Sequence, residues 1–406
     1  MEKIFYNINI FIILFVLFIP VTAIASSNNI GLSSDTYVGG YNLDVNSTTQ
    51  HYMPFYESLD LNYPLNNSEI SFHASGWLRY DAIDQLYSDR TYSDLSYGYL
   101  NYQPRTVPIR FRLGRLNSWF GAADDHYDGF EMLLHTKQGI GFGAFIGNEI
   151  NELSEYETGN ITTGGRVSID RYIFGLGASA FYTKQGMEIR QARWGLDGWL
   201  RPTSMLYLFG RYYYDIVDKE LYDGLIKASL TPTSRLFLNA QYAYFNPVSL
   251  IDKTSIFWVF STEFYRTIEG DIGYRLMDNL SIDIDATKYM YSSYGNSYSY
   301  GGKLTYDRSP YAAGIELHKA DANPTDYLTT RLYVLRNFMM GFYANIDMIY
   351  ASYLGELNGY NHSITGQVAV GKNILDDLKV TISADYLDGP YVRHGGFGML
   401  SIKYDL

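Results

Sequence analysis

The chain has 406 residues, contains no cysteine and carries a formal net charge of −12 at pH 7. The absence of cysteine excludes disulfides, covalent haem attachment and cysteine-ligated iron–sulfur clusters within the chain, and the acidic charge argues against nucleic acid as a partner. Tyrosine is unusually frequent, with 41 Tyr against 22 Phe and 5 Trp. A tyrosine ring can be buried while its hydroxyl stays hydrated, so this composition suits a membrane–water boundary.

The N-terminus has the pattern of a secretory signal peptide over residues 1–25. An apolar run from Ile8 to Ile19 is followed by Ala23-Ile24-Ala25, a small-x-small cleavage site. The run is shorter than the ~20 apolar residues of a membrane-spanning helix. No longer apolar stretch follows, so a membrane-spanning fold would have to be a closed β-barrel. We expect a short periplasmic segment over 26–34 and a single barrel domain over 35–406.

Segments with alternating apolar and polar residues recur along the chain and predict strands with one apolar face. The alternation is clear in Ile70–Asp81, Arg235–Tyr244, Leu280–Tyr289 and Leu378–Tyr386. Their lengths match the ~9–11 residues of a membrane-crossing strand. The sequence therefore predicts an all-β, transmembrane, antiparallel up-and-down β-barrel of about 22 strands, within a range of roughly 18 to 24 because strand boundaries are the least reliable prediction.

Connections between these strands alternate in character. Short turn clusters such as Thr231-Pro232-Thr233-Ser234 alternate with longer polar segments, including 117–126 and 351–361. This asymmetry predicts short periplasmic turns and long extracellular loops. Segment 246–266 fits either a long loop that folds into the lumen or one further strand.

The C-terminal segment has the pattern of a closing barrel strand. Four apolar residues, Leu400, Ile402, Tyr404 and Leu406, alternate with three polar ones, Ser401, Lys403 and Asp405. The apolar set resembles the terminal signal that the barrel-assembly machinery reads, except that Leu406 stands where Phe is usual. The alternative is an edge strand of a soluble sandwich, and the strand pattern of the rest of the chain favours the barrel.

A barrel of this strand number has a lumen too wide for side chains to fill. Charged residues on the predicted inward faces are therefore candidate pore-lining and selectivity residues. These residues are Arg79, Asp81, Arg110, Arg112, Arg166, Arg193, Asp197, Arg211, Asp283, Asp285, Asp347 and Asp385. The alternative is that a hydrated lumen carries such charges without any special arrangement. We find no metal-binding motif, no catalytic motif and no cofactor site, so we expect no enzyme activity.

Three segments carry a family resemblance. They are Ser75–Asp81, the stretch Leu113–Arg115 with Asp128–Phe130 and Gly143–Gly147, and Ser255–Phe260 after Pro247. These pieces are similar to segments of the outer-membrane channel family of metal- and sulfate-reducing bacteria. The resemblance implies either a porin-like channel or the barrel component of a porin–cytochrome conduit, which sheathes multihaem cytochromes.

We therefore expect a protein of the bacterial outer membrane that allows passive diffusion of small solutes and ions. Its acidic charge predicts a modest preference for cations. The alternative is a barrel that holds multihaem cytochromes in its lumen, and gene neighbourhood would separate the two. The expected partners are outer-membrane lipid, the barrel-assembly machinery and small solutes or ions, and a homo-oligomer is left open.

Overall fold

The structure is a computed structural model that describes residues 30–45, 48–65, 69–84, 89–150, 160–246, 264–293, 295–321, 326–390 and 395–405. The expected signal peptide over 1–25, most of segment 246–266 and Leu406 lie outside these residues. None of the helices in the described residues has the length and apolarity needed to cross a membrane.

The described chain is almost entirely strand, with one short helical turn. The elements are β1 (Gly31–Val45), β2 (Thr48–Tyr52), β3 (Pro54–Leu65), β4 (Ile70–Asp81), β5 (Thr91–Tyr102), β6 (Ile109–Phe120), β7 (Ala123–His135), β8 (Ile140–Glu149), β9 (Asn160–Asp170), β10 (Phe174–Gln185), β11 (Glu188–Leu200), β12 (Leu206–Asp215), β13 (Glu220–Thr233), β14 (Leu236–Phe245), β15 (Tyr265–Met277), β16 (Leu280–Tyr291), β17 (Gly295–Arg308), β18 (Tyr311–Asp321), β19 (Tyr327–Asn337), η4 (Met339–Gly341), β20 (Phe342–Leu357), β21 (Tyr360–Asn373), β22 (Leu378–Asp388) and β23 (Gly395–Asp405).

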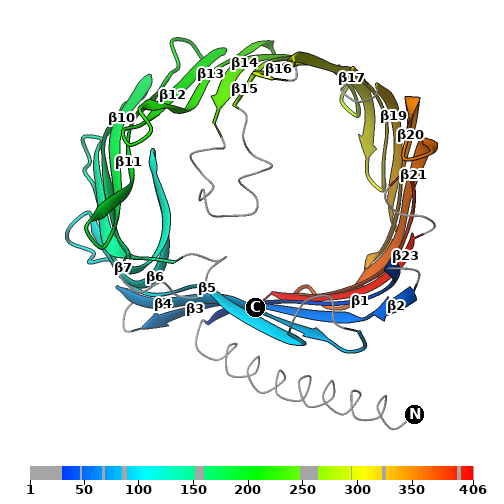
Figure 1. Cartoon of the computed structure of the whole chain (residues 1–406), viewed down its shortest axis with the longest axis horizontal. Coiled ribbons are helices and arrows are strands. Elements are labelled where there is room, and N and C mark those ends of the chain that lie inside the picture. Colours follow the sequence, from blue (N-terminus) through cyan, green and yellow to red (C-terminus); the bar gives the residue numbers. More distant parts are fainter. Residues whose placement is uncertain are drawn as a thin grey trace.

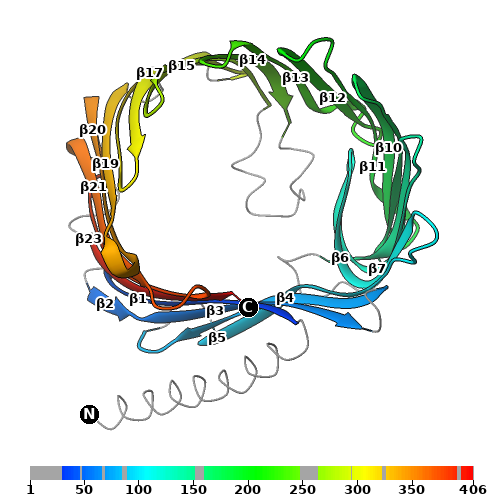
Figure 2. The same ribbon diagram turned by 180° about the vertical axis from the view of Figure 1, so that it is seen from behind.

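The strands form one closed antiparallel barrel (Figures 1 and 2). Each strand pairs with the strands next to it in the chain, except that β2 and β3 do not pair with each other, and β1 also pairs with β23, which closes the ring. Both β2 and β3 pair with β1, on either side of Met53, which lies outside the strands. These two strands share one position in the wall, so the barrel has 22 strand positions and one extra strand segment. The predicted fold class is confirmed.

Side chains alternate between the outer and inner faces of the wall as the sequence predicts. In β16, Ile284 is 52% exposed on the outer face, while Asp283 and Asp285 lie on the inner face. In β22, Ile382 is 64% exposed on the outer face and stands opposite Leu400 of β23. Apolar side chains on the outer face would contact lipid, and a barrel leaves no unpaired sheet edge in the membrane.

The chain ends of the barrel lie at one rim, because the 22 strand positions alternate in direction. β1 begins at Gly31, four residues before the expected domain start, so residues 31–34 of the expected periplasmic segment belong to the wall. The last two strands, β22 and β23, are adjacent as predicted. We refer to the rim with the chain ends as the periplasmic rim and to the opposite rim as the extracellular rim.

Two expected extracellular loops are strands instead. Segment 117–126 contains the end of β6 and the start of β7, joined by a turn at Gly121 and Ala122. Segment 351–361 contains the end of β20 and the start of β21, joined at Asn358 and Gly359. The loop prediction was wrong here because polar and small residues also occur on the inner faces of strands, which do not contact lipid.

Candidate functional site

The inner face of the wall carries pairs of arginine and carboxylate side chains. The predicted lining residues Arg79 and Asp81 bind each other within β4, and their side chains are almost completely buried. The other pairs join adjacent strands, or two strands with one strand between them. They are Arg112–Glu131, Arg166–Asp197, Arg193–Asp215, Arg211–Asp223 and Arg331–Asp347. We call these six pairs the paired arginines.

Sequence reasoning missed four members of these pairs, namely Glu131, Asp215, Asp223 and Arg331. Arg331 stands between Thr330 and Leu332 in β19, and Leu332 is 48% exposed on the outer face. The alternation of β19 therefore places Arg331 on the inner face, and this signal could have identified it. The carboxylates required the strand register, because Arg211 and Asp223 are 12 residues apart and meet only across the β12–β13 pair.

Part of the lumen is filled by a hairpin that bends inward, formed by Leu116–Tyr127 at the ends of β6 and β7. We call it the inward hairpin. Figures 1 and 2 both draw β6 inside the ring of the other strands. The hairpin contacts the inner faces of β9 and β10. At its tip, the backbone N–H of Ala122 donates a 2.9 Å hydrogen bond to Ser179 Oγ on β10.

Glycines on the inner wall make room for the inward hairpin. A Cβ atom at Gly143 would lie 2.4 Å from the Phe120 ring, and one at Gly164 would lie 2.8 Å from the Ala123 Cβ. A Cβ atom at Gly195 would lie 2.8 Å from the Ala122 Cβ. Real Cβ atoms do not approach this closely, so these three positions on β8, β9 and β11 require a residue without a side chain.

The inward hairpin and the wall enclose a small apolar core inside the barrel. It consists of Leu116, Phe120, Ala123, Tyr127, Leu133, Phe145 and Phe181. Within it, Glu131 is fully buried and accepts hydrogen bonds from the Ser118 hydroxyl and from Arg112 Nε, the latter at 2.5 Å. A buried carboxylate needs such partners, because an unpaired charge away from water is costly. This packing fixes one side of the lumen.

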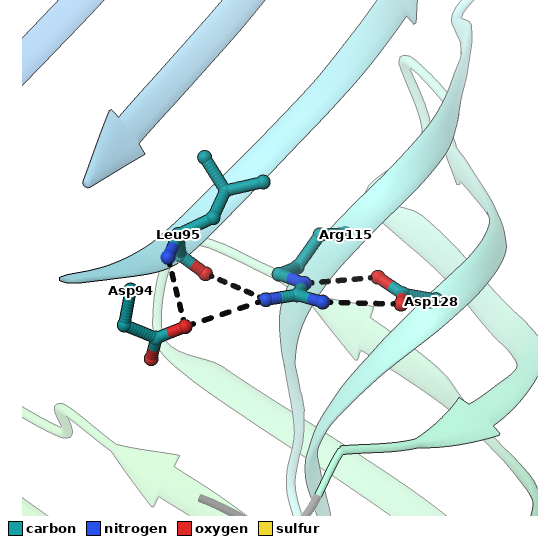
Figure 3. Close-up of polar contacts among 4 residues, drawn as sticks. All are labelled: Asp94, Leu95, Arg115 and Asp128. Carbon is teal, nitrogen blue, oxygen red and sulfur yellow. Dashed lines mark hydrogen bonds and ion pairs between the residues drawn. The ribbon is translucent and has the colours of Figure 1, made fainter. Parts of the chain in front are cut away.

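Two neighbouring strands of the wall separate over part of their length at the place where the inward hairpin departs. Strands β5 and β6 pair only from Gly98–Tyr102 to Phe111–Arg115, although each has 12 residues. Figure 3 shows how Arg115 bridges the gap. Its guanidinium donates to Asp128 Oδ1 at 3.0 Å and to the Leu95 carbonyl at 3.0 Å, and it lies 3.6 Å from Asp94 Oδ1.

Around this gap lies a crevice of about 390 Å³, whose lining includes Leu95, Leu113 and Gly114. Gly114 has a φ of +136°, and a Cβ atom there would lie 2.2 Å from the Gly98 carbonyl oxygen. Only glycine fits this backbone. The seam between β5 and β6 therefore depends on a glycine that permits the bend and an arginine that bridges the separated strands.

The inner faces of β15 and β16 carry a different arrangement, which we call the acidic face. It contains Glu269, Asp271, Asp283 and Asp285. Gln241 Nε2 donates to Glu269 at 2.6 Å, and Asn239 Nδ2 donates to Asp271 at 2.7 Å, so neutral amides serve these two acids. Among the described residues, His318 is the only basic side chain within 4 Å of this face, with Nδ1 3.6 Å from Asp285 Oδ2. Figure 1 shows β15 and β16 across the ring from β4.

Two further predicted lining residues lie on the inner face outside these groups. Arg110 Nε is buried without a hydrogen-bond partner among the described residues. Asp385 stands opposite Gln367 and Phe397, and its Oδ1 is also buried without a partner in the described part of the chain. The same part of the chain contains no group of three or more His, Cys, Asp or Glu side chains that could hold a metal ion.

The predicted assembly signal lies in β23. Leu400, Ile402 and Tyr404 stand opposite Ile382, Val380 and Leu378 of β22, on the outer face. Ser401 stands opposite Thr381 on the inner face. The structure thus gives these residues the orientation that the alternation predicts, while recognition by the assembly machinery stays a prediction.

No protein-family model matches the sequence, and no curated protein sequence matches it. Solved structures do resemble the fold. The siderophore receptor PirA from Pseudomonas aeruginosa matches with a TM-score of 0.60 and 12% identity, over 92% of this chain and 80% of the receptor. The P pilus usher (PapC) translocation pore matches with a TM-score of 0.54 and 8% identity, over 92% of this chain and 99% of the usher chain. OccK8 (OprE) from Pseudomonas aeruginosa has a TM-score of 0.47 and 12% identity, over 93% and 98% of the two chains.

At these identities the likeness establishes the fold alone. The closed barrel and its apolar outer face are those of a β-barrel protein of the bacterial outer membrane.

Proposed function

We propose that this chain is a porin-like channel through which small solutes and ions diffuse passively, with a modest preference for cations. The proposal rests on the uneven distribution of ion pairs between basic and acidic side chains on the inner face. The paired arginines are each matched by a carboxylate, whereas two of the four acids of the acidic face, Glu269 and Asp271, accept hydrogen bonds from neutral amides. Lys303 of β17 stands opposite Asp283, so the four acids of the acidic face outnumber the one lysine in register with them and leave a net negative charge.

Such charge acts strongly inside a barrel. The wall has a low dielectric constant and focuses the field into the lumen, so that cations are concentrated there relative to anions. The paired arginines contribute little net field, because each arginine and its carboxylate are in contact. The inward hairpin fills the lumen beside β9 and β10, so we assign the permeation path to the side that the acidic face borders.

The test is the reversal potential of the purified barrel in a planar bilayer under a salt gradient. We expect a cation-selective potential that shifts toward zero in the variant Asp283→Asn/Asp285→Asn. Asp278→Asn is the matched control, because Asp278 lies in the turn between the same two strands, at the periplasmic rim. A clear anion preference, or an equal shift in the control, would contradict the proposal.

The same measurement separates the channel from a cytochrome sheath. The resemblance of Leu113–Arg115, Asp128–Phe130 and Gly143–Gly147 to the channels of metal- and sulfate-reducing bacteria supports both readings. The chain has no cysteine to attach haem, so electron transfer would belong to a partner. A barrel that shows no conductance alone, and that acquires its function only when a multihaem cytochrome is assembled with it, would favour the sheath.

A further inference from the structure

Three basic side chains on the outer face take no part in the proposed channel. They are Arg266 on β15, Lys288 on β16 and Lys319 on β18, and we call them the outer-rim basic cluster. The register places them on the lipid-facing side: Lys288 stands opposite Ile268, which is 50% exposed, and Lys319 stands opposite Leu328, which is 47% exposed. They lie on neighbouring strands, with β17 between Lys288 and Lys319.

The height of the cluster on the barrel is well defined. All three residues lie near the ends of their strands at the extracellular rim, opposite the rim with the chain ends. Toward the membrane interior, the next outward residues of the three strands are Ile268, Ala286 and Leu317. The cluster therefore marks the upper border of the apolar belt, which is the level of lipid head groups.

Aromatic rings hold each of these cations in place. The Arg266 guanidinium lies 5.6 Å from the Phe264 ring centre and 5.9 Å from that of Tyr244. Lys288 Nζ lies 5.6 Å from the ring centre of Tyr298, and Lys319 Nζ lies 5.8 Å from that of Tyr300. Tyr298 and Tyr300 are both exposed on the outer face of β17. Ring contacts reduce the number of conformations that a long basic side chain visits, so the charges are presented in one arrangement.

The cluster carries more positive than negative charge. Among the described residues, neither Arg266 nor Lys288 has a carboxylate within 4 Å, and only Lys319 is paired, with Asp321 Oδ1 at 2.9 Å. A cation on a lipid-facing surface is costly unless it reaches water or an anion. At this level of the membrane, the anions available are the phosphates of lipid head groups, which accept charge-assisted hydrogen bonds from Lys and Arg.

We propose that the outer-rim basic cluster binds the phosphate-bearing head group of a lipid in the outer leaflet, with the acyl chains lying over Ile268 and Leu317. A lipid A-type glycolipid, which carries two phosphates on one head group, fits three cations spread over four strands. This site is independent of what passes through the lumen.

The opposite rim provides a matched control. Arg336 lies 4.6 Å from the Phe338 ring centre, and Lys372 Nζ lies 4.7 Å from that of Phe342. Both residues also stand on the outer face, since they continue the outward series of Val334 and Val370. They repeat the chemistry of the cluster at the periplasmic rim, where the outer leaflet does not reach.

The experiment is native mass spectrometry of the detergent-solubilised full barrel, titrated with diphosphoryl lipid A, with dephosphorylated lipid A and with inorganic phosphate. The proposal expects diphosphoryl lipid A to bind far more tightly than the other two. Arg266→Gln/Lys288→Gln/Lys319→Gln should weaken its binding by roughly 100-fold, because each basic residue near a charged membrane surface contributes several-fold. Arg336→Gln/Lys372→Gln should leave binding unchanged.

A second variant guards against loss of folding as the cause. Asp321→Asn removes the carboxylate that competes for Lys319, so it should strengthen the binding of diphosphoryl lipid A. Heat-modifiable gel mobility reports whether each variant is folded. Equal binding of dephosphorylated lipid A, equal binding of inorganic phosphate, or wild-type affinity in the folded triple variant would each overturn the proposal.

Discussion

The backbone N–H of Ala122 donates a hydrogen bond to Ser179 Oγ at 2.9 Å, although 57 residues separate the two in the chain. This bond ties the tip of the inward hairpin to the inner face of β10. It forms where the glycines at 143, 164 and 195 place no side chain on the inner face of the wall. The position of the hairpin therefore depends on small residues of three other strands as much as on its own sequence.

An engineered disulfide tests that position. We expect Ala122→Cys/Ser179→Cys to form a disulfide without an added catalyst, because the Ser179 side chain already reaches the backbone of Ala122, with Oγ 2.9 Å from the Ala122 nitrogen, and two cysteines can bridge Cα atoms ~4.4–6.8 Å apart. The wild-type chain has no cysteine, so a shift in gel mobility on reduction reports this bond alone. The control is Ala122→Cys/Ser229→Cys, which uses an inner-face serine of β13. Equal cross-linking in both variants, or in neither, would show that the tip does not rest on β10.

The buried pair of Arg112 and Glu131 should matter far more for stability than a similar pair elsewhere in the lumen. Arg112→Met leaves the fully buried Glu131 carboxylate without its cation, and we expect a loss of about 3–5 kcal/mol in the free energy of unfolding. Arg331→Met breaks a pair whose arginine side chain is 43% exposed, and water screening should hold its cost to about 0–1 kcal/mol.

Urea-induced unfolding of the barrel in detergent micelles measures both changes. The double variant Arg112→Met/Glu131→Met should recover most of the loss, because removing both charges leaves no buried ion without a partner. Similar losses for Arg112→Met and Arg331→Met would show that the interior beneath the inward hairpin is hydrated.

The seam between β5 and β6 should be sensitive to a single methyl group. Gly114→Ala places a Cβ 2.2 Å from the Gly98 carbonyl oxygen, at a φ of +136°. The obstructing atoms, the Gly98 oxygen and the Tyr99 Cα at 2.9 Å, belong to the backbone. The strands must therefore shift, at a cost of about 1–3 kcal/mol or more. Gly366→Ala on β21 is the control, because no atom lies within 4 Å of the Cβ built there. The temperature at which heat-modifiable mobility is lost should fall for Gly114→Ala alone, and a fall of equal size in the control would contradict the strained geometry.

The strands could be predicted from the sequence wherever local alternation decides the outcome. Leu280–Tyr289 and Leu378–Tyr386 alternate apolar and polar residues because one face contacts lipid and the other water. The two-residue period is therefore visible in the sequence of each strand by itself. The closing contact between β1 and β23 follows from the fold class, since a barrel in lipid leaves no edge.

The inward hairpin could not be predicted, because its position depends on residues far away in the chain. Its polar end, with Asp125 and His126, has the composition of a solvated loop, and nothing local shows that Gly143 and Gly195 leave space for it. The pairing of Arg112 with Glu131 was hidden for the same reason. The predicted lining arginines lie on the inner face of the wall, and their role in lining and selectivity stays a prediction. Which of them are neutralised depends on the register of neighbouring strands.

The final strand provides a test of orientation that uses two adjacent residues. Ile402 stands opposite Val380 and Thr36 on the outer face, and Ser401 stands opposite Thr381 and Tyr37 on the inner face. Ile402→Arg puts a charge against lipid, which costs about 2–4 kcal/mol at the midplane of the bilayer and less toward the rims, whereas Ser401→Arg puts the same charge into the lumen at little cost. The yield of folded, heat-modifiable barrel in the outer membrane measures the difference. Because the two substitutions introduce the same side chain one residue apart, equal yields would contradict the assigned faces of β23, and with them the orientation of the strands paired to it.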